Sequence, residues 1–351
     1  MKIAYGFGKA MFASVGAKAS GCRLRGFQEL SKLRRRKLSR TIVALGAMLL
    51  CACGGNALAS SFPVTLGTSS TYGVLVGSGD SMTLNSGLAV SGNVGFGAND
   101  SVSLNHNSFG VSGNAYEDSG FSTSKGSSTV SGTTYSTYSM TQAITDATTA
   151  STAAAGLTAT VGLTDQGGSI NVNGGSVTIK ALGNLSENVL NISALSLTNG
   201  TLTFDDNGYT GAKFIVNITG NFNINSSGSY KSLIQGINGA SASDIIFNIE
   251  NAGSTVSITG NSTNQIIGTI LDPSSNVTLS GGGSLTGALL AGFNNAGKAY
   301  TVTDGSGGFN ITSLGYTPRS GGRVPEPSSI ALFSVGVVAV AAAARRRRKP
   351  R

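Results

Sequence analysis

Residues 255–290 read TVSITGNSTNQIIGTILDPSSNVTLSGGGSLTGALL, the most regular alternation of apolar runs and turn residues in the chain. The runs start at Thr255, Gln265, Val277 and Ser284, roughly ten residues apart, and Gly, Asn and Ser separate them. Such spacing is typical of all-β architectures, a hairpin meander among them. Apolar triplets between turns rich in Asn, Ser, Thr and Gly favour a parallel β-solenoid instead.

The same pattern extends over residues 60–317, which we assign to one β-solenoid domain, followed by a linker at 318–323. Met140–Ala155 differs from its surroundings because it is rich in Ala and has no Gly, so we expect a single helix packed along a sheet. Further strands are expected at Tyr72–Val76, Gly87–Val90, Ser101–Leu104, Ser169–Val172, Ser176–Ile179, Thr201–Phe204, Lys213–Ile218 and Asp244–Ile249.

The charge of the chain is unevenly distributed. The formal net charge of the 351 residues is +9, yet eleven bases lie within residues 2–40 and six within 345–351. Residues 60–344 hold seven bases and fourteen acids, a net charge of −7. The positive charge therefore belongs to the two ends, and the domain between them gives no reason to expect a nucleic-acid partner.

The N-terminal 59 residues have the three parts of a signal peptide. A basic run, Arg34–Arg40, precedes an apolar run, Thr41–Cys53, that is too short for a permanent membrane span. Ala57 and Ala59 supply the small residues of a cleavage site, so we expect the mature chain to start at Ser60. The alternatives are acylation of Cys53 as in a lipoprotein, a twin-arginine signal at Arg35-Arg36 and a start codon at Met11.

The C-terminus also has three parts. Val324-Pro325-Glu326-Pro327 precedes an apolar run, Ile330–Ala344, and then Arg345-Arg346-Arg347-Arg348-Lys349. The apolar run is about 22 Å long as a helix, against a hydrocarbon core of about 30 Å, which suits a transient membrane hold. The arginines stay cytoplasmic by the positive-inside bias, so everything upstream lies outside. An ordinary tail anchor is the alternative.

This arrangement, over residues 324–351, resembles the PEP-CTERM sorting signal of Gram-negative bacteria. The resemblance implies recognition by an exosortase in the inner membrane, cleavage near Pro325-Glu326-Pro327 and delivery outward in cells that produce exopolysaccharide. The residues of the domain resemble the choice-of-anchor A family, adhesive domains of bacterial surface proteins. The matching blocks are Tyr72–Val76, Gly87–Gly95, Phe214–Gly220, Asp244–Ile249, Ile267–Pro273 and Leu285–Gly292.

The same blocks also resemble bacterial ice-binding proteins, and that resemblance implies a right-handed β-helix with a helix alongside. There a flat Thr-rich face is the functional surface. Thr201 with Thr203, and Thr301 with Thr303, form Thr-x-Thr pairs that project from one side of a strand. The pairs are few and do not recur at a regular spacing, so ordinary exposed strand Thr is the competing interpretation.

Catalytic or metal-binding signatures are weak. His106 is the single His and is flanked by Asn residues, which fits a solvated turn better than a zinc ligand or a triad base. The three Cys residues all precede Ser60, which leaves the mature chain without a thiol. Candidates that remain are Glu117-Asp118 and Asp205-Asp206 as calcium ligands, the scattered acids Asp80, Asp165 and Asp272 as hydrolytic carboxylates, and Tyr116, Tyr135, Tyr138 and Tyr230 as sugar-stacking aromatics.

The sequence therefore predicts an exported, non-enzymatic surface or matrix protein without a cofactor or metal. Its expected partners are signal peptidase and exosortase during export, the inner membrane transiently, and an extracellular polysaccharide or surface ligand. The expected mechanism is many weak contacts from a large face rich in Ser, Thr and Asn, multiplied by high copy number. Ice binding is the alternative function, and a carbohydrate-active enzyme is the third.

Overall fold

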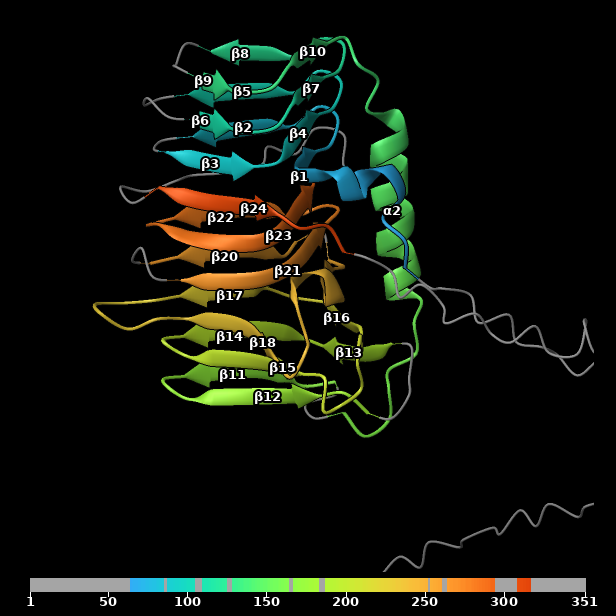
Figure 1. The fold of residues 1–351 in the computed structure, drawn as a ribbon, viewed down its shortest axis with the longest axis vertical. Helices are drawn as coiled ribbons and strands as arrows, with labels where there is room; N and C mark the ends of the chain where they lie inside the picture. The colour runs from blue at the N-terminus through green and yellow to red at the C-terminus, as the bar shows by residue number, and fades with distance from the viewer. Residues whose placement is uncertain are drawn as a thin grey trace, which may run out of the picture. The chain divides into compact units, whose positions relative to one another are not determined.

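Apolar residues at alternate positions bury one side of many of the strands, which is the pattern of a solenoid wall. In β20 (Thr255–Thr259), Val256 and Ile258 are buried while Thr255 is exposed. Every strand pair between described residues is parallel. Figure 1 shows the strands stacked as successive coils. The parallel β-solenoid is therefore confirmed, and a hairpin meander is excluded.

The computed structural model describes residues 64–84, 87–104, 109–124, 128–163, 167–182, 187–251, 253–260, 264–293 and 308–316. The chain divides into two units, Met1–Ser60 and Ser61–Arg351, and the described residues all belong to the second. The predicted signal peptide, linker and sorting signal lie outside them, as do His106, Asp165, Thr301 and Thr303. Among the described residues, no helix is both long and apolar enough to cross a membrane.

The chain forms two stacks of coils joined by one long helix. The first stack follows a 3₁₀ helix, η2 (Gly67–Thr71), and contains β1 (Tyr72–Val76), β2 (Ser81–Leu84), β3 (Leu88–Ser91), β4 (Asn93–Phe96), β5 (Ser101–Leu104), β6 (Phe109–Val111), β7 (Ala115–Glu117), β8 (Ser122–Ser124), β9 (Ser128–Val130) and β10 (Thr134–Ser136). The helix is α2 (Thr141–Ala155), where one was predicted.

The second stack contains longer strands. They are β11 (Ser169–Asn173), β12 (Ser176–Lys180), β13 (Asn188–Ile192), β14 (Ala194–Thr198), β15 (Thr201–Asp205), β16 (Phe214–Ile218), β17 (Phe222–Asn225), β18 (Leu233–Ile237), β19 (Ile245–Ile249) after η3 (Ala242–Asp244), β20, β21 (Gln265–Asp272), β22 (Asn276–Ser280), β23 (Gly283–Ala291) and β24 (Phe309–Ser313). Each strand expected from sequence is present, with ends shifted by one residue at most.

The order of the coils in space differs from their order in the chain. One row of strands runs β10-β7-β4-β1-β23-β21-β18-β15-β12, so the first stack grows away from β1 and ends at β10. Helix α2 then returns along the outside to the opposite end, where β11 and β12 begin the second stack (Figure 1). The second stack grows back until β23 pairs with β1, and β24 pairs with β3. The two stacks therefore meet in the middle of the solenoid.

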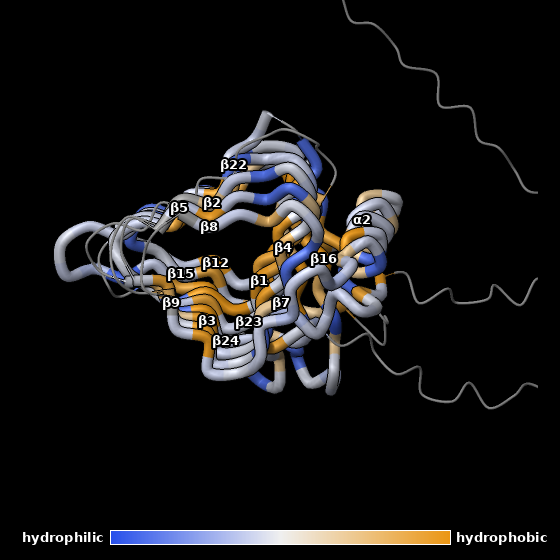
Figure 2. Tube along the Cα trace, turned by 90° about the horizontal axis from the view of Figure 1, so that it is seen from above, coloured by the Kyte–Doolittle hydropathy of each residue, from blue (hydrophilic) through white to orange (hydrophobic). Residues whose placement is uncertain are grey.

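The coils have three faces that surround the hydrophobic core, and Figure 2 shows apolar residues gathered inside them. The helix-covered face holds β13, β16, β19, the second halves of β21 and β23, β1, β4, β7 and β10. The polar face holds β12, β15, β18, the first halves of β21 and β23, β24, β3, β6 and β9. The third face holds the two remaining sheets, β11-β14-β17-β20-β22 and β2-β5-β8.

Two glycines form the corner at which β21 and β23 pass from the polar face to the helix-covered face. Gly268 and Gly287 have φ of 119° and 149°, and the two are register neighbours. A Cβ on Gly287 would lie 1.9 Å from the carbonyl oxygen of Gly268. Only glycine combines this backbone conformation with so close an approach of neighbouring coils.

Helix α2 packs on the sheet through small residues and a ladder of asparagines. Ala143, Ala147, Ala150, Ser151 and Ala154 form its buried side. Asn191, Asn217 and Asn248 are register neighbours on β13, β16 and β19, and their side chains are hydrogen-bonded in series. The Asn217 amide donates to the carbonyl oxygen of Ala154 at 2.7 Å, and the Ser151 hydroxyl donates to Asn248 Oδ1 at 2.6 Å. Polar side chains buried in this sheet therefore serve to hold the helix.

Candidate functional site

The polar face presents a continuous outward row across nine strands. Each member is the register partner of the next, so the side chains lie side by side along the solenoid. From the β12 end to the β9 end the row is Ser176, Thr201, Leu233, Gln265, Ser284, Asn310, Ala89, Gly110 and Thr129. At a strand spacing of about 4.8 Å, the row is about 38 Å long.

A second row, two residues further along each strand, is richer in Thr. Thr178 pairs with Thr203, and Thr286 pairs with Thr312. Thr203, one of the residues singled out in the sequence, is mostly buried, and its Oγ1 accepts a hydrogen bond from Gln235 Nε2 at 3.3 Å. The members of this row are Thr178, Thr203, Gln235, Ile267, Thr286, Thr312 and Ser91.

These two rows contain no Asp, Glu, Lys or Arg among their described members. At the β3, β6 and β9 end they flank a shallow groove, which exists because Ala89 and Gly110 have little or no side chain. The outer surface of the third face is similar, with Asn171, Ser196, Asn223, Ser257 and Thr278 in one row. The Ser/Thr/Asn-rich surface expected from sequence therefore occupies two faces, of which the polar face is continuous over nine strands.

The predicted sugar-stacking tyrosines separate into two groups. Tyr116, Tyr135 and Tyr138 pack together at the β10 end of the helix-covered face. Tyr230, 69% exposed, lies elsewhere, between β17 and β18. The sequence offers no signal for this grouping because it depends on the register of β7 and β10.

Two acids lie buried at a corner of the first stack. The backbone N–H of Asp80 donates to Asp100 Oδ1 at 2.9 Å, and the residues are 2% and 1% exposed. Burial, and then the charge of Asp100, raises the pKa of Asp80 to about 8. Burial also raises the pKa of Asp100 to about 7, although backbone hydrogen bonds from Asp80 and Gly97 act to lower that pKa. Carboxyl groups buried this deeply have no access to a glycosidic bond.

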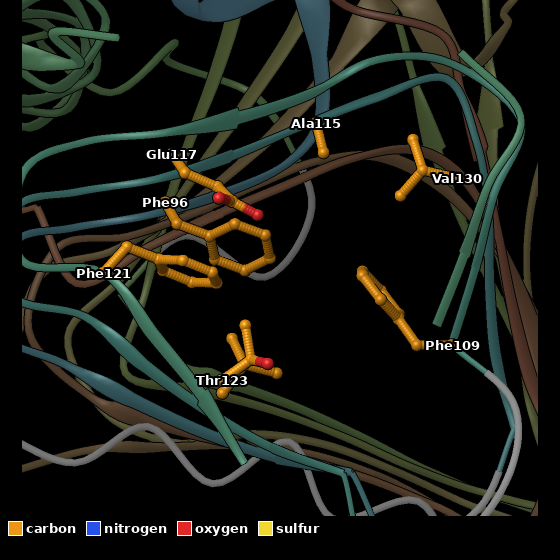
Figure 3. Close-up of a pocket in the computed structure, with 8 residues that line it drawn as sticks. Phe96, Phe109, Ala115, Glu117, Phe121, Thr123 and Val130 are labelled. Carbon is orange, nitrogen blue, oxygen red and sulfur yellow. The ribbon is translucent and has the colours of Figure 1, made fainter. Parts of the chain in front are cut away.

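Glu117 and Asp118 do not converge on a common ion. Figure 3 shows the Glu117 carboxylate inside the solenoid, at the β8–β10 end, among Phe96, Phe109 and Phe121. The cavity there is about 30 Å³, enough for about one water molecule and too small for a sugar. Burial raises the pKa of Glu117. Asp118 instead accepts a hydrogen bond from the backbone N–H of Met140 at 2.8 Å.

Asp205 and Asp206 also make separate contacts. Asp205 Oδ1 accepts hydrogen bonds from Asn238 Nδ2 and from the backbone N–H of Asn207, both at 2.8 Å. Asp206 Oδ2 accepts a hydrogen bond from the backbone N–H of Gly211 at 3.3 Å. Among the described residues, no three acids, histidines or cysteines are grouped as metal ligands would be. These acids act as turn acceptors, and the polar face is the surface best suited to binding.

Two family models match the chain. The model described as "Putative Ice-binding-like adhesive domain" matches residues 51–311, about three quarters of the chain. The model of the PEP-CTERM protein-sorting motif matches residues 323–348, where the sequence pattern indicated that signal. Comparison with curated proteins found no match.

Solved structures of similar proteins include several that are described as ice-binding. A glycosylated ice-binding protein from an Arctic yeast is 19% identical, with a TM-score of 0.48, and the match covers 74% of this chain and 96% of that one. An ice-binding protein from the Antarctic ascomycete Antarctomyces psychrotrophicus is 18% identical, with a TM-score of 0.45 and coverage of 72% and 98%. A domain of Shewanella frigidimarina ice-binding protein 1 is 20% identical, with a TM-score of 0.43 and coverage of 72% and 97%.

Proposed function

The chain belongs to the family of ice-binding-like adhesive domains and carries a PEP-CTERM sorting motif, and on that premise we propose that it is a surface adhesin. In this proposal an exosortase sorts the protein, and the mature form makes non-enzymatic contacts with a polysaccharide matrix or a neighbouring surface. Within the family, the strand blocks quoted above support membership of the choice-of-anchor A group.

The polar face is the observation that carries the proposal. Its first row crosses nine strands and its second row seven, and most members of both rows carry a hydroxyl or amide group without a formal charge. Each exposed hydroxyl or amide contributes little when it exchanges water for a partner. Many such groups in a fixed array, on many copies of the protein at one surface, give strong attachment through multivalency.

Export is part of the same proposal. Signal peptidase removes residues 1–59, between Ala59 and Ser60, and exosortase cleaves near Pro325-Glu326-Pro327. The terminal basic clusters are discarded in these two steps, so the exported product is acidic. Mass spectrometry of the protein recovered outside the cells would locate both cleavages, and an intact Arg345–Arg348 cluster in that product would contradict exosortase processing.

Deletion of the gene tests the adhesive role. We expect the deletion strain to lose attachment, aggregation or retention of matrix, and to regain it when the full-length gene is restored. Unchanged behaviour in all three assays would contradict the proposal. Removal of the exosortase should produce the same loss, since the protein then stays in the inner membrane.

Ice binding is a second candidate because Thr178, Thr286 and Thr312 on the polar face reach solvent, and Thr286 and Thr312 lie in register. A flat array of hydroxyl groups at strand spacing is a surface on which ordered water can assemble. Thermal hysteresis and ice recrystallisation assays on the full-length protein separate the two functions. Inhibition of recrystallisation at micromolar concentration would favour ice binding, and its absence would leave adhesion.

A further inference from the structure

The helix-covered face carries a group of tyrosines in ring contact. Two of them belong to β7 and β10, which lie at the end of this face, beyond the first turn of α2 (Figure 1). Tyr116 in β7 and Tyr135 in β10 are register neighbours, and their rings stack with centroids 4.9 Å apart and planes 11° apart. The Tyr138 ring packs edge-on against the Tyr116 ring, with centroids 4.9 Å apart. The Tyr72 ring, in β1, also packs edge-on against the Tyr116 ring, with centroids 5.6 Å apart. We call Tyr72, Tyr116, Tyr135 and Tyr138 the tyrosine cluster.

The outer members of the tyrosine cluster are exposed although they are packed against each other. Tyr72 is 5% exposed, whereas Tyr135 and Tyr138 are 42% and 48% exposed. β10 is the last strand of its row in the described part of the chain, so no further strand there covers Tyr135. One face of the Tyr135 ring stacks on Tyr116, and no described strand lies on the opposite side of this 42% exposed residue.

The backbone holds the exposed rings in place. Thr137, between Tyr135 and Tyr138, has φ of 63°, a conformation that a β-branched residue rarely adopts. The turn is fixed on both sides, because the Tyr138 N–H donates to the carbonyl oxygen of Glu117 and the Met140 N–H donates to Asp118 Oδ2, both at 2.8 Å. Binding to this surface therefore costs little ordering of its side chains.

The chemistry of the surface matches a sugar ring. A tyrosine ring is a rigid apolar plate with a hydrogen-bonding edge, and a pyranose has C–H bonds on its faces and hydroxyl groups around its rim. A pyranose stacked on the open face of Tyr135 continues the ladder at the next strand position, about 4.8 Å away. The net charge of −7 over residues 60–344 opposes a polyanion, so a neutral polymer fits best.

We propose that the tyrosine cluster is a binding site for a neutral polysaccharide, in which a hexopyranose ring stacks on Tyr135 and contacts Tyr138. This site lies on the helix-covered face and is separate from the polar face. Its test is therefore independent of the adhesive role proposed for the polar face.

Affinity gel electrophoresis of the full-length protein tests the site, with hydroxyethylcellulose in the gel as the neutral probe and alginate as a polyanionic control. We expect hydroxyethylcellulose alone to retard the protein. Tyr135→Ala and Tyr138→Ala should each weaken the retardation about tenfold, and Tyr135→Phe should retain it because the ring remains. Tyr230→Ala, which removes an exposed tyrosine outside the tyrosine cluster, should behave as the wild type does.

Three results would overturn the proposal. They are wild-type protein that migrates unretarded in hydroxyethylcellulose, retardation that Tyr135→Ala leaves intact, and equal losses in Tyr230→Ala and Tyr135→Ala. Sedimentation velocity excludes another occupant: a wild-type dimer that Tyr135→Ala converts to a monomer would assign the tyrosine cluster to self-association and contradict a sugar site.

Discussion

The first stack of coils contains two carboxyl groups that are buried away from solvent. Asp80 and Asp100 are nearly fully buried, and both oxygens of Asp80 and Oδ2 of Asp100 have no hydrogen-bond partner among the described residues. A buried carboxyl group without a partner favours its neutral form. The raised pKa values of about 8 and about 7 therefore link the stability of the domain to pH.

The stability of the protein should fall as pH rises from about 5 to about 9. The folded pKa of Asp80 lies above its unfolded value, so the folded state holds the extra proton; this contribution is complete below about pH 4 and is lost as pH rises through about 8. The free energies of unfolding in urea at pH 5 and pH 9 should differ by several kcal/mol, since each pH unit over which the folded state holds one extra proton contributes about 1.4 kcal/mol. Asp80→Asn should reduce the difference in free energy of unfolding between the two pH values. An identical pH dependence in the variant and the wild type would contradict the role of Asp80.

Gly287→Ala should destabilise the solenoid by about 3 kcal/mol, because the added Cβ would lie 1.9 Å from the Gly268 oxygen on a backbone with φ of 149°. Gly110→Ala is the matched control, since its Cβ meets no atom within 4 Å. Its free energy of unfolding should stay unchanged or rise by up to about 1 kcal/mol. Equal effects in urea titrations of the two variants would show that the corner is not constrained.

The elements follow from local sequence to a large extent. Alternation of apolar and polar residues marks strands such as β20 and β22, and the Ala-rich, Gly-free stretch marks α2. The sequence alone does not mark Asn191, Asn217 and Asn248 as residues that hold the helix. Their role depends on the helix lying across three strands that are far apart in the sequence. The residue pattern of any one strand does not indicate which helix will pack on it.

Asn217→Ala should loosen α2 and cost about 3 kcal/mol. The substitution removes the amide that donates to the buried carbonyl oxygen of Ala154 and to Asn191 Oδ1. Asn223→Ala, at an outward position of the third face, should change stability by at most about 0.5 kcal/mol. Circular dichroism during urea unfolding measures both, and equal losses would contradict the ladder.

At the scale of the whole molecule, the meeting of the two stacks was not predictable from sequence. β1 pairs with β23 although more than half of the chain separates them, and the repeat between them is irregular. Ser81 pairs with Ser101, whereas Thr201 pairs with Leu233, so a coil takes about 20 residues in one stack and about 32 in part of the other. The polar face is continuous over nine strands only because β24 and β3 join the two stacks.

Attachment through the polar face should depend only weakly on salt. The two outward rows contain no formal charge, so screening has no ion pair to weaken. Cells that display the protein should attach equally well between about 0.05 and about 0.5 M NaCl, across which the Debye length falls severalfold. Loss of attachment at the higher salt concentration would indicate charged contacts elsewhere on the surface.

One pair of variants tests the adhesive face most directly. Thr312→Arg places a long charged side chain at an exposed position of the polar face, and Thr255→Arg places the same side chain at an exposed position of the third face. With equal amounts of folded protein at the surface, Thr312→Arg should reduce attachment of the cells severalfold, whereas Thr255→Arg should match the wild type. Equal attachment by both variants and the wild type would contradict the assignment of the polar face.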